Sequence, residues 1–226
     1  MSIDLSKIKF IPKVYIVESP SYDDYISERS EGVILCKSLK MMGINSVYFP
    51  VFTMEGFKFA LNKIKILPED MPDEGEVKLP VLHISAHGNR DCFALTNDET
   101  VNWKMFREIL IPVNESCFQL LTVSMSVCRG YNAIKATHTT DNDTLPYLYI
   151  IGPTNNTPWV EAMLAFQVFY YNFSHLFDED LKALKTKLDA VAPQSDFQIV
   201  DGEEAKEKYI KLMEKIKGVF EKYKSC

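Results

Sequence analysis

The sequence predicts an α/β fold in which a mostly parallel sheet of about five to six strands carries helices on both faces, as a three-layer sandwich. Short runs rich in Val, Ile and aromatic residues alternate with longer stretches whose apolar residues recur at helical spacing. In addition, 46% of the 226 residues are hydrophobic and 25% are charged, which is typical of a globular chain with a substantial core.

Strands and helices are expected in alternation along the chain. Runs rich in β-formers predict strands at residues 14–17, 47–49, 81–85, 118–125, 148–151 and 197–200. Apolar residues at helical spacing predict helices at residues 27–43, 54–64, 104–110, 159–173 and 180–191. The fourth strand is the most continuous apolar run, so we expect it in the centre of the sheet, buried on both faces.

The end of the chain is predicted to be a separate helical element. Residues 1–200 are expected to form one domain, and residues 201–226 a C-terminal amphipathic helix. Asp201 and Glu204 have the spacing of a capping box, and an apolar stripe follows them. This helix either packs on its own domain or docks a partner.

Charge and cysteine content exclude several classes of function. The net charge is -6, and neither nucleic acid nor an anionic membrane surface attracts such a chain. No apolar run approaches the roughly 20 residues that span a bilayer, and the N-terminus does not resemble a signal peptide, so we expect a cytosolic protein without membrane contact. The five cysteines are irregularly spaced and form no CxxC, which predicts neither a disulfide framework nor a metal site.

Reactive side chains follow two consecutive strands. His87-Gly88 comes directly after the third expected strand, and Cys128 comes directly after the fourth. Either residue alone is more often structural than catalytic. Because the carboxyl ends of parallel strands meet at one edge of a sheet, however, we expect the imidazole and the thiol to lie close together. An imidazole can take the proton of a thiol whose ordinary pKa is about 8.5, which is the chemistry of a cysteine hydrolase.

These segments resemble a known family. Residues 84–88, Ile-Ser-Ala-His-Gly, look like the His-Gly motif of caspases, and residues 126–130, Ser-Val-Cys-Arg-Gly, resemble the Gln-Ala-Cys-Arg-Gly pentapeptide of that family. Residues 93–98 and Trp103 are similar to a segment of the CHAT proteases, caspase relatives of bacterial defence and signalling systems. The resemblance covers residues 13–180 and points to a short, bacterial defence-type caspase-like peptidase.

The resemblance implies a caspase-hemoglobinase fold and cleavage of protein or peptide substrates through a thioester acyl-enzyme, with no metal or other cofactor. By this resemblance Cys128 is the nucleophile, His87 is the acid/base residue, and Gly88 belongs to the oxyanion hole. It also implies a regulated effector whose sensor is a separate protein.

Five residues are candidates for substrate binding. Arg29 lies where caspases place an arginine that binds an aspartate side chain of the substrate, but Ser126 replaces their pocket-lining Gln, so the cleavage preference is left open. Asn155, Asn156 and Trp159 follow the fifth strand, where the substrate cleft should have a wall. Solvation for Arg29 and helix packing for Trp159 are the alternative interpretations.

Other functions remain open at this stage. His83 is a second candidate for the base, and the chain could be an adaptor that retains the fold without using its chemistry. A serine hydrolase using Ser124 or Ser126 is a third class, although no GxSxG motif surrounds either residue. Residues 130–146 are expected to form a polar loop, in which residues 141–143, Asp-Asn-Asp, could permit self-cleavage.

Overall fold

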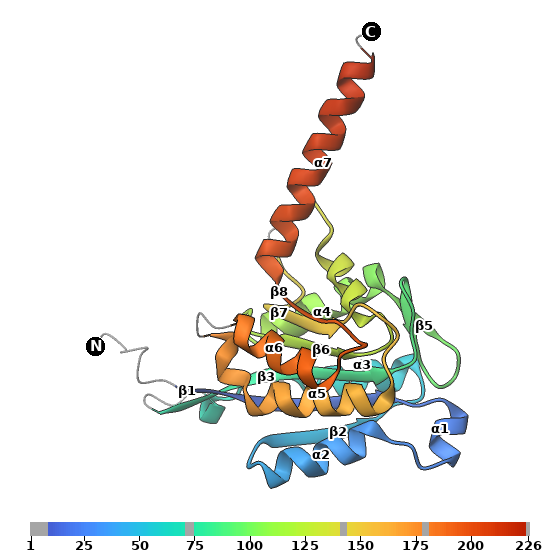
Figure 1. The fold of residues 1–226 in the computed structure, drawn as a ribbon, viewed down its shortest axis with the longest axis vertical. Coiled ribbons are helices and arrows are strands. Elements are labelled where there is room, and N and C mark those ends of the chain that lie inside the picture. The colour runs from blue at the N-terminus through green and yellow to red at the C-terminus, as the bar shows by residue number, and fades with distance from the viewer. Residues whose placement is uncertain (1–8, 71–74, 141–143, 178–180, 225–226) are drawn as a thin grey trace.

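The computed structural model describes residues 9–70, 75–140, 144–177 and 181–224, and it contains a six-stranded sheet of order β2-β1-β3-β6-β7-β8 (Figure 1). All neighbouring pairs are parallel except β7 with β8, which is antiparallel. The strands are β1 (Lys9–Ser19), β2 (Asn45–Pro50), β3 (Glu76–Ala86), β6 (Thr122–Ser126), β7 (Tyr149–Pro153) and β8 (Phe197–Asp201). The predicted α/β class with a mostly parallel sheet is confirmed.

Helices cover both faces of this sheet. The α-helices are α1 (Tyr22–Ile26), α2 (Glu31–Met41), α3 (Met54–Leu61), α4 (Trp103–Ser116), α5 (Trp159–Tyr171), α6 (Leu181–Val191) and α7 (Gly202–Lys224). The chain also forms the 3-10 helices η2 (Pro68–Asp70), η3 (Gly130–Thr137) and η4 (Phe173–Leu176). One hydrophobic cluster joins the sheet to α3 and α4, and a second joins it to α2, α5 and α6.

The sequence of β1 explains why both faces are covered. Val14 and Ile16 point into the cluster beneath α2 and α5, whereas Tyr15 and Val17 point into the cluster beneath α3 and α4. All four side chains are buried, and successive residues of a strand face opposite sides of a sheet. A continuous apolar run of this kind is stable only between two layers of helices.

The fourth strand begins later than predicted. β6 starts at Thr122, whereas the apolar run suggested a start near residue 118. Phe118 and Gln119 have positive φ angles of 52° and 64°, and Phe118 is 70% exposed. Both residues belong to the turn that follows α4, where Asn114 accepts a hydrogen bond from the N–H of Leu121 at 3.0 Å. Hydrophobicity alone could not distinguish this turn from the strand.

Two segments expected to be irregular contain regular structure. The insert after β3 forms the hairpin of β4 (Cys92–Ala94) and β5 (Thr100–Asn102), and Phe93 and Val101 are fully buried there. The polar stretch 130–146 begins with η3, and residues 141–143, where self-cleavage was considered, lie outside the described residues.

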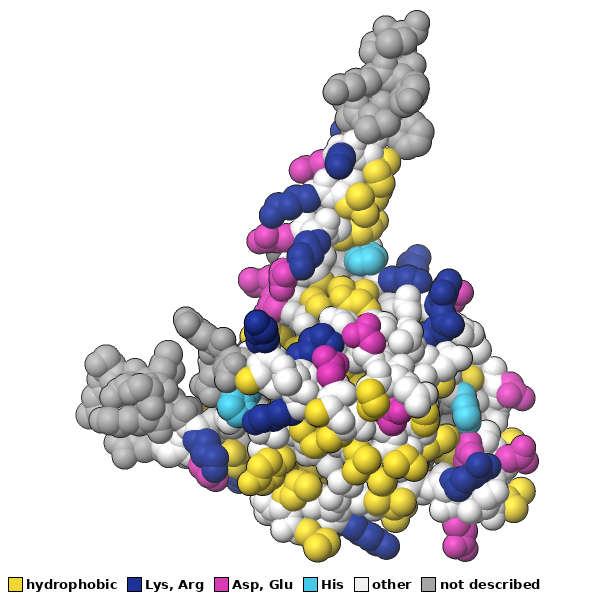
Figure 2. Space-filling view, viewed as in Figure 1, with side chains coloured by type: hydrophobic (Ala, Val, Ile, Leu, Met, Phe, Trp, Pro, Cys, Tyr) yellow, Lys and Arg dark blue, Asp and Glu magenta, His cyan; other side chains and the backbone are white. Residues whose placement is uncertain are grey.

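The C-terminal helix α7 begins on the body of the molecule and then leaves it (Figure 1). Asp201 accepts hydrogen bonds from the N–H groups of Glu203 and Glu204 at 2.8 and 3.1 Å, which confirms the predicted cap. Ala205 is buried, and His138 stacks on Tyr209 with ring centroids 4.6 Å apart. Beyond this point, hydrophobic side chains line one side of the helix and remain exposed, including Leu212, Met213 and Ile216 (Figure 2).

Candidate active site

The pairing of β3 with β6 places the predicted nucleophile and base at one edge of the sheet. These strands are parallel neighbours, and Ser85 is the register partner of Ser126. His87 and Cys128 each lie two residues further along the chain, so both leave the sheet at the same level. β3 and β6 follow each other along the chain among the strands of this sheet, and they are also neighbours within it, as expected from the sequence.

A narrow pocket of about 70 Å³ opens at this edge. Its walls come from the ends of β3 and β6, from the first turn of α2, and from the start of α5. The lining residues are Glu31, Ala86, His87, Ser126, Val127, Cys128, Thr157, Trp159 and Ala162. The structure thus brings together four residues singled out from the sequence, namely His87, Cys128, Ser126 and Trp159.

The imidazole of His87 is held by a carboxylate. Its Nε2 atom lies 2.7 Å from Oδ2 of Asp24 in α1, and the Trp159 ring stands nearly perpendicular to it with a centroid distance of 6.2 Å. The His87 side chain is 53% exposed, whereas that of Asp24 is 6% exposed. His87 is therefore accessible to a substrate on one side and fixed by a buried acid on the other.

The surroundings of Asp24 favour the negatively charged form of its carboxyl group. Burial by itself would raise the pKa of this carboxyl, but hydrogen bonds from Ser21 and His87 and the charge of Arg29 together hold its pKa below the ordinary value. Ser21 donates to Oδ2 at 2.6 Å, and its hydroxyl also accepts from the backbone N–H of Asp24 at 3.1 Å as the N-cap of α1. Ser21 thus orients the Asp24 carboxylate independently of its contact with His87.

Cys128 lies at the start of a tight turn directly after β6. It is partly exposed, and the next residue, Arg129, has a φ of 59° and donates its backbone N–H to the Asn155 carbonyl at 2.9 Å. A Cβ added to Gly130 would come within 2.7 Å of the Met125 carbonyl oxygen, so the turn requires glycine. The Cys-Arg-Gly sequence therefore has a local structural reason.

Gly88 lies where the histidine loop passes the cysteine loop. A Cβ at this position would approach Val127 Cγ1 to 2.3 Å and the Cys92 carbonyl oxygen to 2.9 Å. The two loops can pack this closely only because residue 88 has no side chain. The glycine that the resemblance assigns to the oxyanion hole is thus adjacent to the residue that precedes Cys128.

A buried acid, Glu31, lies inside the pocket. Its side chain is 2% exposed and sits in the first turn of α2. Ser85 donates to Oε2 at 2.8 Å, and the hydroxyl of Ser126 lies 2.7 Å from both oxygens. Glu31 therefore connects α2 to the ends of β3 and β6.

The other candidate base and nucleophiles lie deeper. His83 is fully buried, its Nδ1 lies 2.9 Å from the Tyr170 hydroxyl, and its ring stands edge-on to Phe166. Ser124 is also fully buried, and Ser126 donates its hydroxyl to Glu31. His83 and Ser124 are register partners on neighbouring strands, but both are fully buried, so neither is accessible to a substrate.

Three predicted substrate contacts lie outside the pocket wall. Arg29 is 61% exposed and places its guanidinium 3.2 Å from Oδ1 of Asp24. Asn155 and Asn156 hold the turn after Cys128, because the carbonyl of Asn155 accepts from the N–H of Arg129 and the side chain of Asn156 accepts from its Nε at 3.1 Å. These residues support the loops around the pocket.

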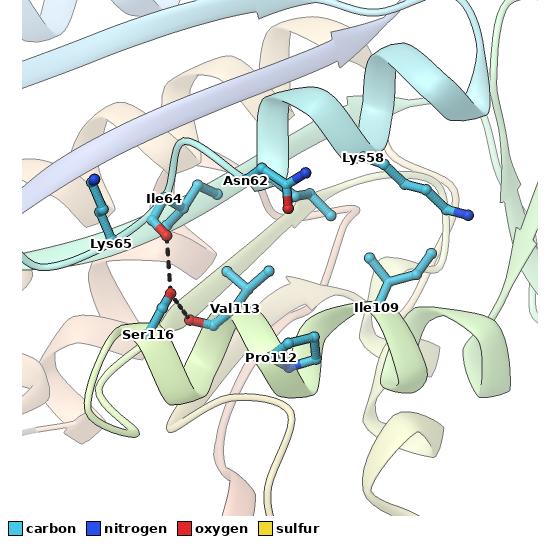
Figure 3. A pocket seen from close by; sticks show the side chains of 9 residues that line it. Lys58, Asn62, Ile64, Lys65, Ile109, Pro112, Val113 and Ser116 are labelled. Carbon is cyan, nitrogen blue, oxygen red and sulfur yellow. Dashed lines mark hydrogen bonds between the residues drawn. The ribbon is translucent and has the colours of Figure 1, made fainter.

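A second hollow lies between α3 and α4, away from the thiol (Figure 3). Apolar residues such as Ile109 and Val113 line it, with Lys58 and Lys65 at its sides. Ser116 also lines this hollow, and its hydroxyl donates to the carbonyls of Ile64 and Val113 at 3.2 and 2.7 Å. The described lining of this hollow contains no thiol and no imidazole.

Asp24 and Glu31 were not identified from the sequence. Both follow a serine that caps a helix, and acids in a first helical turn usually serve the helix itself. The available signal was their place after β1, since loops at the carboxyl ends of neighbouring parallel strands converge. Thr157 on the pocket wall carried no distinguishing signal.

Two solved structures are similar to this chain over most of its length. The Drosophila initiator caspase Dronc matches with a TM-score of 0.49 and 13% identity, covering 83% of this chain and 78% of that chain. The structure of pro-sf-caspase-1 matches with a TM-score of 0.47 and 10% identity, covering 82% and 80%. No protein-family model and no curated protein matches the sequence.

Proposed function

We propose that this protein is a caspase-like cysteine endopeptidase in which Cys128 is the nucleophile, His87 is the acid/base residue, and Asp24 orients His87. The observation that carries the proposal is the convergence of thiol and imidazole on one pocket, with a buried carboxylate behind the imidazole. A nucleophile, a base and a group that orients the base are the arrangement that covalent acyl transfer requires.

The reaction would proceed in two balanced steps. With Asp24 accepting from Nε2–H, neutral His87 keeps Nδ1 free to take the thiol proton. The sulfur of Cys128 attacks the carbonyl carbon of the scissile peptide, the C–N bond breaks, and His87 returns the proton to the leaving amine. A water molecule then attacks the thioester carbon and loses a proton to His87. The Cys128 thiolate leaves and recovers that proton from His87, and the product is a carboxylic acid.

The tetrahedral intermediates of both steps carry a negative oxygen. Backbone N–H groups of Gly88 and Cys128 are the proposed donors, since the loops that carry them pack against each other through Val127. The absence of a side chain at Gly88 is what allows a substrate carbonyl to approach the backbone closely.

Covalent labelling tests this proposal directly. Acyloxymethyl ketone peptides with Arg, Lys, Leu, Ala or Asp at the reactive position are incubated with the protein, and the adduct is located by intact mass and peptide mapping. We expect an adduct on Cys128 that disappears in His87→Ala and persists in the matched variant His175→Ala. If every probe fails and Cys128 alkylates no faster than Cys92, the chain is an adaptor with unused chemistry.

The biological setting belongs to the proposal as well. A role as a regulated effector in a bacterial defence or signalling system, a CHAT-type affiliation, a separate sensor or regulatory partner and a cytosolic location remain predictions. Within the described ranges, no helix combines the length and the apolar character needed to cross a bilayer.

A further inference from the structure

The pocket beside Cys128 has an acidic interior. Among the described residues that line it, Glu31 is the one carboxylate, and none is lysine or arginine. Glu31 shares this wall with Cys128, His87 and Ser126, so a substrate side chain next to the scissile bond would meet it.

The described hydrogen-bond partners of the Glu31 side chain are hydroxyl groups. Both serine hydroxyls, from Ser85 and Ser126, donate to its oxygens, which is the pattern of an acceptor-only carboxylate. Nε2 of His83 is 3.6 Å from Oε1, longer than a hydrogen bond, and has no hydrogen-bond partner among the described residues. The first turn of α2 also favours negative charge. The described hydrogen bonds to the Glu31 carboxylate therefore come from uncharged hydroxyl groups.

The pocket suits a long, unbranched cation. Small residues, Ala86, Ser126 and Ala162, form part of its walls, and Glu31 is the one acidic side chain among its described lining residues. Trp159 lies at the same pocket and offers an apolar face to the methylene groups of lysine or arginine.

Arg29 does not supply a positive charge to this pocket. Its guanidinium is paired with Asp24, outside the pocket lining. A substrate aspartate would instead bring its carboxylate toward Glu31, and two like charges at short range repel each other.

We propose that Glu31 forms the floor of the primary specificity pocket and selects substrates with lysine or arginine immediately before the scissile bond. This inference rests on the proposed peptidase function and adds its substrate class.

The test compares labelling rates within the ketone panel. In the wild type, the Arg and Lys probes should label Cys128 on the order of 100-fold faster than the Ala probe, because a buried charge pair contributes this much. The Asp probe should be the slowest. Glu31→Gln keeps the shape of the side chain and should reduce the ratio of Arg to Ala rates to about 1. Glu55→Gln, an exposed acid in the first turn of α3, is the matched control and should keep the wild-type ratio.

The outcomes separate the two proposals. Labelling of Cys128 that is fastest with Leu, Ala or Asp overturns the basic preference and leaves the peptidase intact. A wild-type ratio in Glu31→Gln also overturns the role of Glu31. Absence of any adduct removes the peptidase and the inference drawn from it.

A second measurement does not depend on turnover or on folding of the Glu31 variant. Agmatine, which carries a guanidinium on a short chain, should slow iodoacetamide alkylation of Cys128 in the wild type and leave Cys92 unaffected. Butyrate at the same concentration should give no protection. Equal effects of agmatine and butyrate, or no effect of agmatine, would contradict an anionic pocket floor.

Discussion

The Nε2 atom of His87 lies 2.7 Å from Oδ2 of Asp24, a residue 63 positions earlier in the chain. This contact joins the segment after β1 to the segment after β3, two neighbouring strands of the sheet. Because a carboxylate only accepts hydrogen bonds, it fixes the proton of neutral His87 on Nε2. In the proposed mechanism, Asp24 thereby leaves Nδ1 as the nitrogen that takes the thiol proton.

Replacing Asp24 with asparagine should impair the chemical step. Asparagine can present its amide N–H₂ to Nε2 and stabilise the other tautomer, so we expect kcat to fall on the order of 100-fold with little change in KM. Steady-state kinetics on the best peptide substrate would measure both constants. Asp23→Asn changes an exposed acid of the same helix and should behave as wild type. Equal losses in both variants, or a change in KM alone, would contradict the orienting role.

The difference in stability between wild type and Asp24→Asn should depend on pH. The pKa of Asp24 is lowered in the folded protein, so its stabilising contribution is present above the ordinary value of about 3.9 and is lost as the pH falls through the folded value. In urea unfolding, wild type should exceed Asp24→Asn in stability at pH 7, and this difference should shrink below pH 4. A difference that is constant, or that grows in acid, would refute the assignment.

The cysteines should differ strongly in reactivity. Cys36 and Cys117 are buried, and burial raises the pKa of the Cys117 thiol to about 11, so neither should alkylate in the native state. At pH 6.5, iodoacetamide should modify Cys128 on the order of 10-fold faster than the partly exposed Cys92, because His87 can take its proton. Peptide mapping over time gives both rates in one sample.

The control for this experiment is His87→Ala. This variant should slow the alkylation of Cys128 to about the rate of Cys92. The alkylation rate of Cys92 should be unchanged, so Cys92 is an internal reference. If the variant left the Cys128 rate intact, the imidazole would not be acting on this thiol.

Gly88→Ala should disturb the contact between the histidine and cysteine loops. A new Cβ would overlap Val127 and the Cys92 carbonyl, so we expect a loss of about 1–3 kcal/mol in the free energy of unfolding and reduced labelling of Cys128. Gly56→Ala is the control, because its Cβ would meet atoms no closer than 3.6 Å inside α3. That change should be neutral or stabilise by up to about 1 kcal/mol. Thermal unfolding of the two variants would decide.

The layer architecture was predictable because its signals are local. The apolar runs at residues 14–17 and 81–85 lack the alternation of a strand with one solvent-exposed face, which predicts burial on both faces. These runs lie in β1 and β3. The predicted cap at Asp201 also acts through short-range hydrogen bonds. The start of β6 was misjudged because the backbone conformation of Phe118 depends on contacts with α4 and not on hydropathy.

The candidate site was predictable only in part. His87 and Cys128 stood out because each follows a strong strand, and the register of Ser85 with Ser126 then brings them together. Asp24 and Glu31 reach the same site from segments that precede β2, and their contacts depend on β1 lying beside β3. Strand order of this kind is a property of the whole fold, which no local pattern records.

Glu31, Ser85 and Ser126 form one interlocked unit that spans a helix and two strands. Replacing the acid with an apolar residue would leave two buried hydroxyls without an acceptor, and replacing the serines alone would strip a buried carboxylate of its donors. Under the proposed specificity, changing the pocket floor from acidic to apolar would therefore require both serines to change together with Glu31.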